Sequence, residues 1–143
     1  MERNLFDDID LQIMICNERI KNHKKSIEKA KKMCGWNGPN EIGGMDYSQD
    51  KTTPNVHISF DEAVRMIDRD EEKIRDLMEE RKELRRRKKH IKKIYENLKG
   101  YEGKIYYNRI ILNRTQEETA REISLSTRQE QRIESDMRDR GLM

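Results

Sequence analysis

Apolar residues in the first part of the chain recur at alternating steps of three and four positions. Two interleaved rows with a seven-residue repeat carry this pattern: Phe6, Ile13, Ile20, Ile27 and Cys34, and Ile9, Cys16, His23 and Ala30. Such a repeat places both rows on one side of an α-helix, as in a coiled coil. The pattern therefore predicts an amphipathic helix over residues 1–34, with His23 as a polar interruption and Gly35 as its stop.

A second double row follows between residues 59 and 99. Its positions are Phe60, Ile67, Ile74, Arg81, Lys88 and Tyr95, and Ala63, Asp70, Leu77, Leu84, Ile91 and Leu98. Ser59 and Glu62 match a capping box at its start. The rows predict a long, basic, coiled-coil-like helix over residues 59–99, ended by Gly100 and Gly103. Its polar row positions either set the register of pairing or lie at the stripe edge, with their charged ends in water.

The segment between these helices, residues 35–58, has a different composition. Its sequence, GWNGPNEIGGMDYSQDKTTPNVHI, contains four glycines and two prolines, which exclude a regular helix. Two interpretations fit its aromatic and apolar residues. The segment is either a loop that docks a partner or a connector that covers the end of a helical hairpin, and we favour the connector.

Residues 100–143 predict three short helices. The apolar run KIYYNRIILNR indicates the first of them. In TQEETAREISLSTRQEQRI, two capping boxes that begin at Thr115 and Ser126 start the second and the third. The tight turn between these two contains Leu125 as an apolar plug. Two short helices joined in this way are typical of a helix-turn-helix, whose second helix enters the DNA major groove.

The composition supports an all-α protein. Apolar residues make up 33% of the chain and charged residues 41%, too few core-forming side chains for a large globular core. We predict long coiled-coil-like helices in a helical hairpin, followed by a small C-terminal helix-turn-helix domain over residues 100–143. The long helices pair either within one chain or between two. The thin core favours a homo-oligomer, with a dimer preferred.

Charge is distributed unevenly along the chain. The net charge of +3 does not by itself require a nucleic-acid partner. Residues 61–80 contain nine acidic and four basic residues, whereas the run RKELRRRKKHIKK at residues 81–93 is strongly basic. Five of its side chains are candidate phosphate contacts: Arg85, Arg86, Lys89, Lys92 and Lys93. The alternative is a solvated face of a coiled coil.

Patterns of catalysis and cofactor binding are missing from the sequence. It shows no nucleophile with a nearby base and no glycine-rich phosphate loop, so we predict no enzyme activity and no cofactor. The histidines are scattered without zinc-finger spacing, which argues against a metal site. Cys16 and Cys34 are expected to remain reduced thiols in a cytoplasmic protein. No apolar run reaches the roughly eighteen residues of a membrane-spanning helix.

The predicted third short helix carries side chains suited to base edges on its outward face. Arg can bond bidentately to guanine and Gln to adenine, while Thr and Ser serve bases or phosphates. The N-terminus of the preceding helix offers backbone N–H groups to a phosphate. The candidate DNA-binding residues are Thr115, Gln116, Ser126, Thr127, Arg128, Gln131, Arg132 and Ser135, with Arg138 on the same face.

The stretch TQEETAREISLSTRQEQRI resembles region 4 of sigma-70-type factors. The residues that match the motif are Thr115, Glu117, Glu118, Ala120, Ile123, Leu125, Ser126, Arg128, Arg132 and Ile133. The order of WNGPNEIGG, SFDEAVRMI and this motif is also similar to phage late-gene transcriptional regulators of the RinA and ArpU type. This resemblance covers most of the chain, although the specific motif lies near its C-terminal end. It implies sequence-specific DNA binding and control of a phage or mobile-element operon.

Three positions depart from the sigma-like pattern. Thr119 stands where an aliphatic residue is usual, and Ser124 occupies a turn position that often holds glycine. Glu130 replaces the Val that normally packs beneath the recognition helix. A carboxylate there must turn to solvent, pair with an Arg or incur several kcal/mol of burial cost.

These observations lead us to expect a DNA-binding transcriptional regulator that activates its operon. Double-stranded DNA is the expected partner, and RNA polymerase is a candidate partner. Two alternatives remain open. A phage small terminase subunit would bind a packaging site and assemble as a ring, and a helical adaptor would bind a protein and no DNA.

Overall fold

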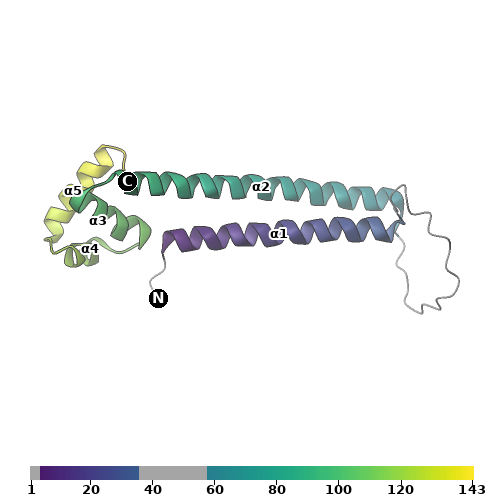
Figure 1. The fold of residues 1–143 in the computed structure, drawn as a ribbon, viewed down its shortest axis with the longest axis horizontal. Coiled ribbons are helices and arrows are strands. Elements are labelled where there is room, and N and C mark those ends of the chain that lie inside the picture. The colour runs from purple at the N-terminus through teal and green to yellow at the C-terminus, as the bar shows by residue number, and fades with distance from the viewer. Residues whose placement is uncertain (1–3, 36–57) are drawn as a thin grey trace. The chain divides into compact units, whose positions relative to one another are not determined.

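The computed structural model describes residues 4–35 and 58–143, and it is all-helical in these two ranges (Figure 1). This confirms the predicted all-α class. The elements are α1 (Leu5–Met33), α2 (Phe60–Asn97), α3 (Gly100–Tyr106), the π-helical turn η1 (Tyr107–Ile111), α4 (Gln116–Glu122) and α5 (Thr127–Asp139). The connector or docking loop predicted for residues 35–58 lies outside the described residues except at its two ends.

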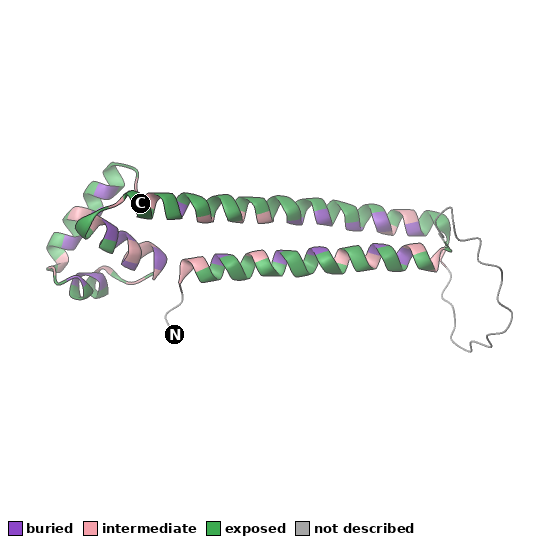
Figure 2. Ribbon diagram, in the orientation of Figure 1, coloured by how far each residue is buried: buried purple, intermediate pink, exposed green. Residues whose placement is uncertain are grey.

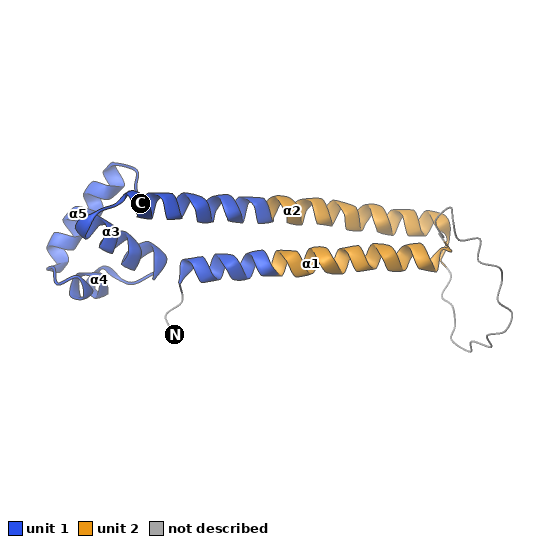
Figure 3. Ribbon diagram, in the orientation of Figure 1, with its two compact units in different colours: residues 1–14, 81–143 blue, residues 15–80 orange. Residues whose placement is uncertain are grey.

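The chain divides into two compact units, coloured separately in Figure 3. One comprises residues 15–80, which include the C-terminal part of α1 and the N-terminal part of α2. The other comprises residues 1–14 and 81–143, which include the remaining parts of both long helices and all the shorter ones. Each unit has its own buried positions.

In the unit of residues 15–80, the predicted apolar rows of α1 and α2 form the core. The buried apolar residues of the two helices are Cys16, Ile20, Ile27, Ala30, Ala63, Ile67, Ile74 and Leu77. They recur at helical spacing along both ribbons in Figure 2. The Ile58 N–H donates to the Met33 carbonyl at 3.4 Å, which joins the facing ends of the two segments. The heptad rows thus identified the buried stripes of this unit, except at Phe60, which is 58% exposed.

The polar interruptions of the two rows meet each other in this unit. His23 Nδ1 lies 2.9 Å from Asp70 Oδ1. Burial acts to raise the pKa of Asp70, but hydrogen bonds to Ser26 and His23 outweigh it and lower the pKa below its usual value. A polar residue inside an apolar row is tolerated here because its partner occupies the facing row.

The other unit has one contiguous apolar core. It contains buried side chains from α1, α2, α3, η1 and α5 and from the residue that follows α4: Ile9, Ile91, Ile105, Tyr106, Ile111, Ile123 and Met137. At the edge of this core, the Lys88 ammonium contacts both carboxylate oxygens of Asp10, at 2.5 and 2.6 Å. Lys88 is half-buried, which fits the interpretation of its row position as a stripe edge with a charged end in water.

The long helix ends at Asn97, shortly before Gly100, but the predicted terminating role of Gly103 is wrong. Gly100 has a φ of +64°, the left-handed conformation that glycine adopts at low cost. Gly103 instead lies inside α3 and is buried. A Cβ at this position would come within 3.2 Å of the Leu98 carbonyl oxygen. Gly103 is therefore needed for the close approach of α3 to the end of α2, and α3 begins at Gly100, before the predicted start.

Candidate nucleic-acid interface

Both capping boxes predicted in the C-terminal segment are confirmed. The Thr115 hydroxyl accepts from the Glu118 N–H at 3.3 Å, and the Glu118 carboxylate accepts from the Thr115 N–H at 2.8 Å. These bonds lower the pKa of Glu118. At α5, Ser126 and Gln129 form the same reciprocal pair, at 3.3 and 3.1 Å. The caps fix where α4 and α5 begin and so fix which residues face outward.

A tight turn joins α4 to α5. The Leu125 N–H donates to the Ala120 carbonyl at 2.9 Å, and the Ser124 N–H donates to the Arg121 carbonyl at 3.2 Å. This is the bond pattern of a Schellman motif, with Ser124 in its left-handed position at a φ of +59°. Ala120 is buried, and the half-buried Leu125 packs against the core as the predicted apolar plug. The small Ala120 side chain allows α5 to pack closely on α4.

The outward face of α5 presents most of the predicted DNA-binding residues to solvent. Arg128, Gln131, Arg132 and Ser135 are exposed, while Thr127 is half-buried. The N-cap residues Thr115 and Ser126 are exposed, but their hydroxyls are engaged in the capping boxes. Gln116 is half-buried. The predicted residues therefore separate into an exposed row along α5, two N-caps that hold the helix starts, and two half-buried residues.

Beneath this face lies a polar network that the sequence analysis missed. Glu134 is 1% exposed, and its carboxylate accepts from Arg109 Nε at 2.9 Å and Arg109 Nη2 at 3.3 Å. It also accepts from Gln116 Nε2 at 3.1 Å and from Arg138. Gln131 Nε2 donates in turn to Gln116 Oε1 at 3.3 Å. The network thus connects the ion pair of half-buried Arg109 and buried Glu134 with two predicted DNA-binding residues.

The π-helical turn η1 positions Arg109 for this network. Asn108 is buried there: its Nδ2 donates to the Lys104 carbonyl at 2.9 Å, and its Oδ1 accepts from Arg114 Nη1 at 2.7 Å. Arg109 Nη1 donates to the Arg114 carbonyl at 2.6 Å. These bonds hold the Arg109 guanidinium in one orientation. Sequence periodicity gives no signal for such a turn or for an ion pair between residues on separate helices.

Glu130, the most serious departure from the sigma-like pattern, is fully buried. Among the described residues, neither of its carboxylate oxygens has a hydrogen-bond donor within reach, and Arg109 Nε lies 4.0 Å away. Burial, then the hydrogen bond and the charge of Glu134, raise the pKa of Glu130 to about 7. As a neutral acid, Glu130 can donate a hydrogen bond to Glu134. Below pH 7 it therefore packs mainly as a carboxylic acid where the motif has an apolar residue.

Glu134 behaves in the opposite way. Burial acts to raise its pKa, but the hydrogen bonds from Arg109, Gln116 and Glu130 outweigh it and lower the pKa to about 2. Two carboxyl groups at adjacent turns of α5 thus titrate far apart because one has the guanidinium and the other does not. Glu134 remains ionised at neutral pH.

The Thr119 departure also lies in the interior. Its side chain is fully buried, and its hydroxyl has no hydrogen-bond partner among the described residues. The motif has an aliphatic residue at this position, and the position is indeed interior, although Thr119 brings a hydroxyl into it. Thr119 and Glu130 are thus interior positions, and Ser124 is an exposed turn residue, so none of the three departures lies in the exposed row of α5.

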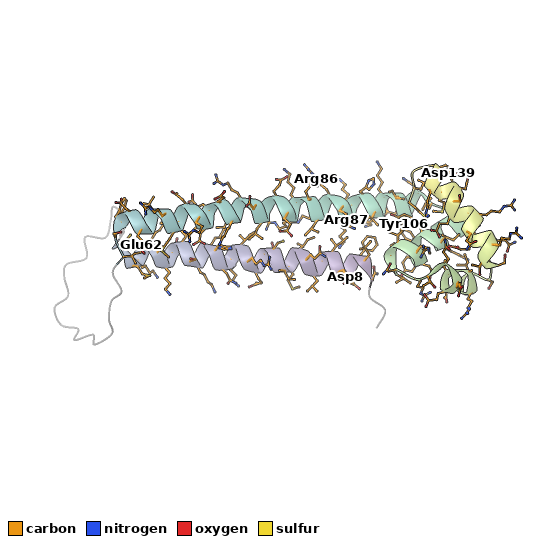
Figure 4. All side chains as sticks on the ribbon, turned by 180° about the vertical axis from the view of Figure 1, so that it is seen from behind. Asp8, Glu62, Arg86, Arg87, Tyr106 and Asp139 are labelled. Atoms are coloured by element: carbon orange, nitrogen blue, oxygen red, sulfur yellow. The ribbon has the colours of Figure 1, made fainter. Side chains whose placement is uncertain are left out.

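The five candidate phosphate contacts on α2 are all exposed. With 3.6 residues per turn, they fall within an arc of roughly 120° on one side of the helix. Arg86, labelled in Figure 4, projects from this side and is held by Glu83 at 2.5 Å. Lys92 lies 3.8 Å from Glu96. These exposed pairs are weak, so both side chains remain available to a phosphate.

Comparisons of the chain with family models, curated proteins and solved structures found no match. The resemblance to sigma-like regulators therefore stays an expectation from the motif. Within the described ranges, no three His, Cys, Asp or Glu side chains gather into a group that could hold a metal ion. The helices described here include none with the length and apolar character to cross a membrane.

Proposed function

We propose that the protein is a non-enzymatic, sequence-specific DNA-binding regulator of transcription. In this proposal α4 and α5 act as a helix-turn-helix, and α5 lies in the major groove. The observation that carries the proposal is the exposed row of Arg128, Gln131, Arg132 and Ser135 on a helix whose inner side is fixed by burial and by Glu134. These four side chains are of the types that read base edges.

The exposed basic side of α2 supports the same proposal. Lys and Arg side chains on one face of a helix neutralise phosphates and strengthen binding without regard to sequence. This face belongs to the same compact unit as α5. Under the proposal, α2 supplies affinity and α5 supplies specificity, the usual division between phosphate and base contacts.

The finer architecture belongs to the proposal as well. We infer a helical hairpin of α1 and α2 that carries the DNA-reading helices, with two copies of the chain bound to paired half-sites. The resemblance to phage late-gene regulators supports an operon of a phage or mobile element as the target and activation as the effect. It also makes RNA polymerase the candidate protein partner.

The first test is selection of binding sites from a random-sequence duplex library, followed by binding measurements on the selected duplex at several salt concentrations. We expect one enriched sequence. Arg128→Ala/Arg132→Ala should weaken specific binding by about 10-fold or more, because each bidentate base contact contributes about 1–3 kcal/mol of discrimination. The matched control is Arg69→Ala/Arg75→Ala, which removes two exposed arginines from the other unit and should bind normally.

The same measurements test the basic face of α2. Lys89→Ala/Lys93→Ala should lower affinity for every duplex alike and reduce the slope of log affinity against log salt by roughly 2. An unchanged slope would mean that the basic face of α2 contacts solvent and no phosphates. Failure of the intact protein to enrich any duplex would contradict DNA reading and favour the helical adaptor.

A further inference from the structure

The hydrogen bonds beneath α5 form a chain with a defined direction. It starts at Arg109, which donates twice to the buried carboxylate of Glu134. Gln116 donates to the same carboxylate at 3.1 Å. Gln131 then donates to the Gln116 amide oxygen at 3.3 Å. The chain therefore leads from a buried ion pair to an exposed side chain on the outward face of α5.

The buried ion pair determines which way both amide groups turn. An ionised carboxylate has acceptors and no donor, and Arg109 keeps Glu134 ionised. Gln116 must therefore turn its NH2 group toward Glu134 and its oxygen toward Gln131. Gln131 must in turn present its NH2 group to that oxygen. With either amide reversed, two acceptors would face each other.

This arrangement leaves Gln131 with a specific hydrogen-bonding edge. One of its two N–H groups is engaged by Gln116, so one N–H and the side-chain oxygen remain available at the exposed surface. Adenine presents a matching pair in the major groove, the N7 acceptor and the N6 donor. Guanine presents two acceptors, O6 and N7, and Gln131 has only one N–H left to donate.

We infer that Gln131 reads an adenine in the major groove and that Gln116 is a positioning residue that fixes the orientation of the Gln131 amide. The inference rests on the proposed DNA-binding function and specifies the base that one side chain recognises. Gln116 itself need not touch the base. Glu134 orients Gln116, and Gln116 in turn orients Gln131. The ion pair of Arg109 and Glu134 on the inner side of α5 therefore matters for readout on the outer side.

The test selects duplexes from a random-sequence library with the intact protein, with Gln131→Ala and with Gln116→Met. The intact protein should select a site with a position at which adenine is preferred and Gln131→Ala has no preference. Gln116→Met, similar in length but without the amide, should lower that preference between about 5-fold and 150-fold. Preferences at the other positions should remain. The double variant should lose no more than Gln131→Ala alone, because the two residues act through one contact.

Two controls separate positioning from general loss of structure. Gln129→Met removes a glutamine amide at the start of α5, where the amide oxygen accepts from the Ser126 N–H. It should lower stability, but it leaves the bonds among Glu134, Gln116 and Gln131 in place, so the adenine preference should remain. In the second control, the intact protein binds its selected duplex with 7-deazaadenine at the identified position. Without the N7 acceptor, the affinity should fall about as much as with Gln131→Ala, and no variant has to fold for this measurement.

Several outcomes would overturn the inference. They are an unchanged base pattern with Gln131→Ala, a base other than adenine at the position it affects, or full affinity for the 7-deazaadenine duplex. Retention of the adenine preference in Gln116→Met would overturn the positioning role. If the intact protein selected no sequence at all, the proposed function itself would fail, which distinguishes the two failures.

Discussion

At the scale of single residues, the candidate interface depends on two carboxyl groups one turn apart on α5. Glu134 is ionised and fully engaged, whereas Glu130 is buried with no donor within reach among the described residues. The contrast between Glu130 and the apolar residue of the sigma-like pattern identified this position from the sequence alone. Its neighbour Glu134 lies one turn further along the same helix, but Arg109 could not be predicted, because no periodicity links side chains on separate short helices.

The buried Glu130 predicts a stability that falls as the pH rises. The pKa of Glu130 is about 7 in the folded chain, above the value of 4.5 that an exposed Glu has, so the folded state binds an extra proton between these values. Its contribution is fully present below pH 4.5 and is lost as the pH rises through 7. Glu130→Gln should therefore be more stable than the wild type at pH 8 by roughly 1–3 kcal/mol and nearly equal to it at pH 5.

Urea unfolding between pH 5 and pH 8 measures this difference, in a range where Glu134 stays ionised. Glu130→Val removes the titrating group, so its stability should lack the decrease between pH 5 and pH 8 that Glu130 causes in the wild type. The exposed Glu117 provides the matched control, since Glu117→Gln makes the same substitution on the surface and should not reproduce the gain expected of Glu130→Gln at pH 8. A constant difference between the wild type and Glu130→Gln across the range would show that Glu130 is not buried as an acid.

At the scale of elements, the sequence predicted the positions of the helices well because each has a periodic or capping signal. The heptad rows of α1 and α2 correspond to buried stripes, and the boxes at Thr115 and Ser126 mark the helix starts. The errors occurred where the local signal was ambiguous. Gly103 suggested a stop but serves close packing, and the π-helical turn η1 has no pattern of its own.

The contact between His23 and Asp70 gives a prediction for the pairing of the two long elements. A buried polar pair often contributes less stability than apolar residues of similar size, while removal of one partner leaves the other unsatisfied. We expect His23→Leu/Asp70→Leu to raise the free energy of unfolding by about 1–2 kcal/mol. Asp70→Leu alone should be less stable than the double variant, because His23 loses its partner.

Urea unfolding at pH 7 provides the measurement. Lys24→Leu/Glu71→Leu is the matched control, because it places the same residues one position further along each helix, where both side chains are exposed. This control should change stability by no more than about 0.5 kcal/mol. A double variant less stable than Asp70→Leu would mean that the two positions do not face each other.

At the scale of the whole molecule, the structure changes the physical basis for expecting an oligomer. The thin core suggested that the long apolar stripes would be covered by a second chain. In each compact unit, however, the stripe of α1 is buried within the same chain. A dimer would therefore need another apolar surface, and the described residues include one on α1, where Leu11 is 54% and Met14 61% exposed.

We expect the protein in solution to have twice the chain mass of 17.3 kDa, with Leu11 and Met14 in the contact. Leu11→Glu/Met14→Glu should halve the mass measured by light scattering, because a carboxylate at an apolar contact loses its hydration without gaining a partner. The intact protein should bind a duplex with paired half-sites more tightly than a duplex with one half-site. The variant should lose this difference but keep the affinity for a single half-site. Gln12→Glu, an exposed charge change on the same helix, is the control and should remain a dimer. A monomeric wild type would contradict the binding of two copies to paired half-sites. A mass of many chains would favour the ring expected of a small terminase subunit.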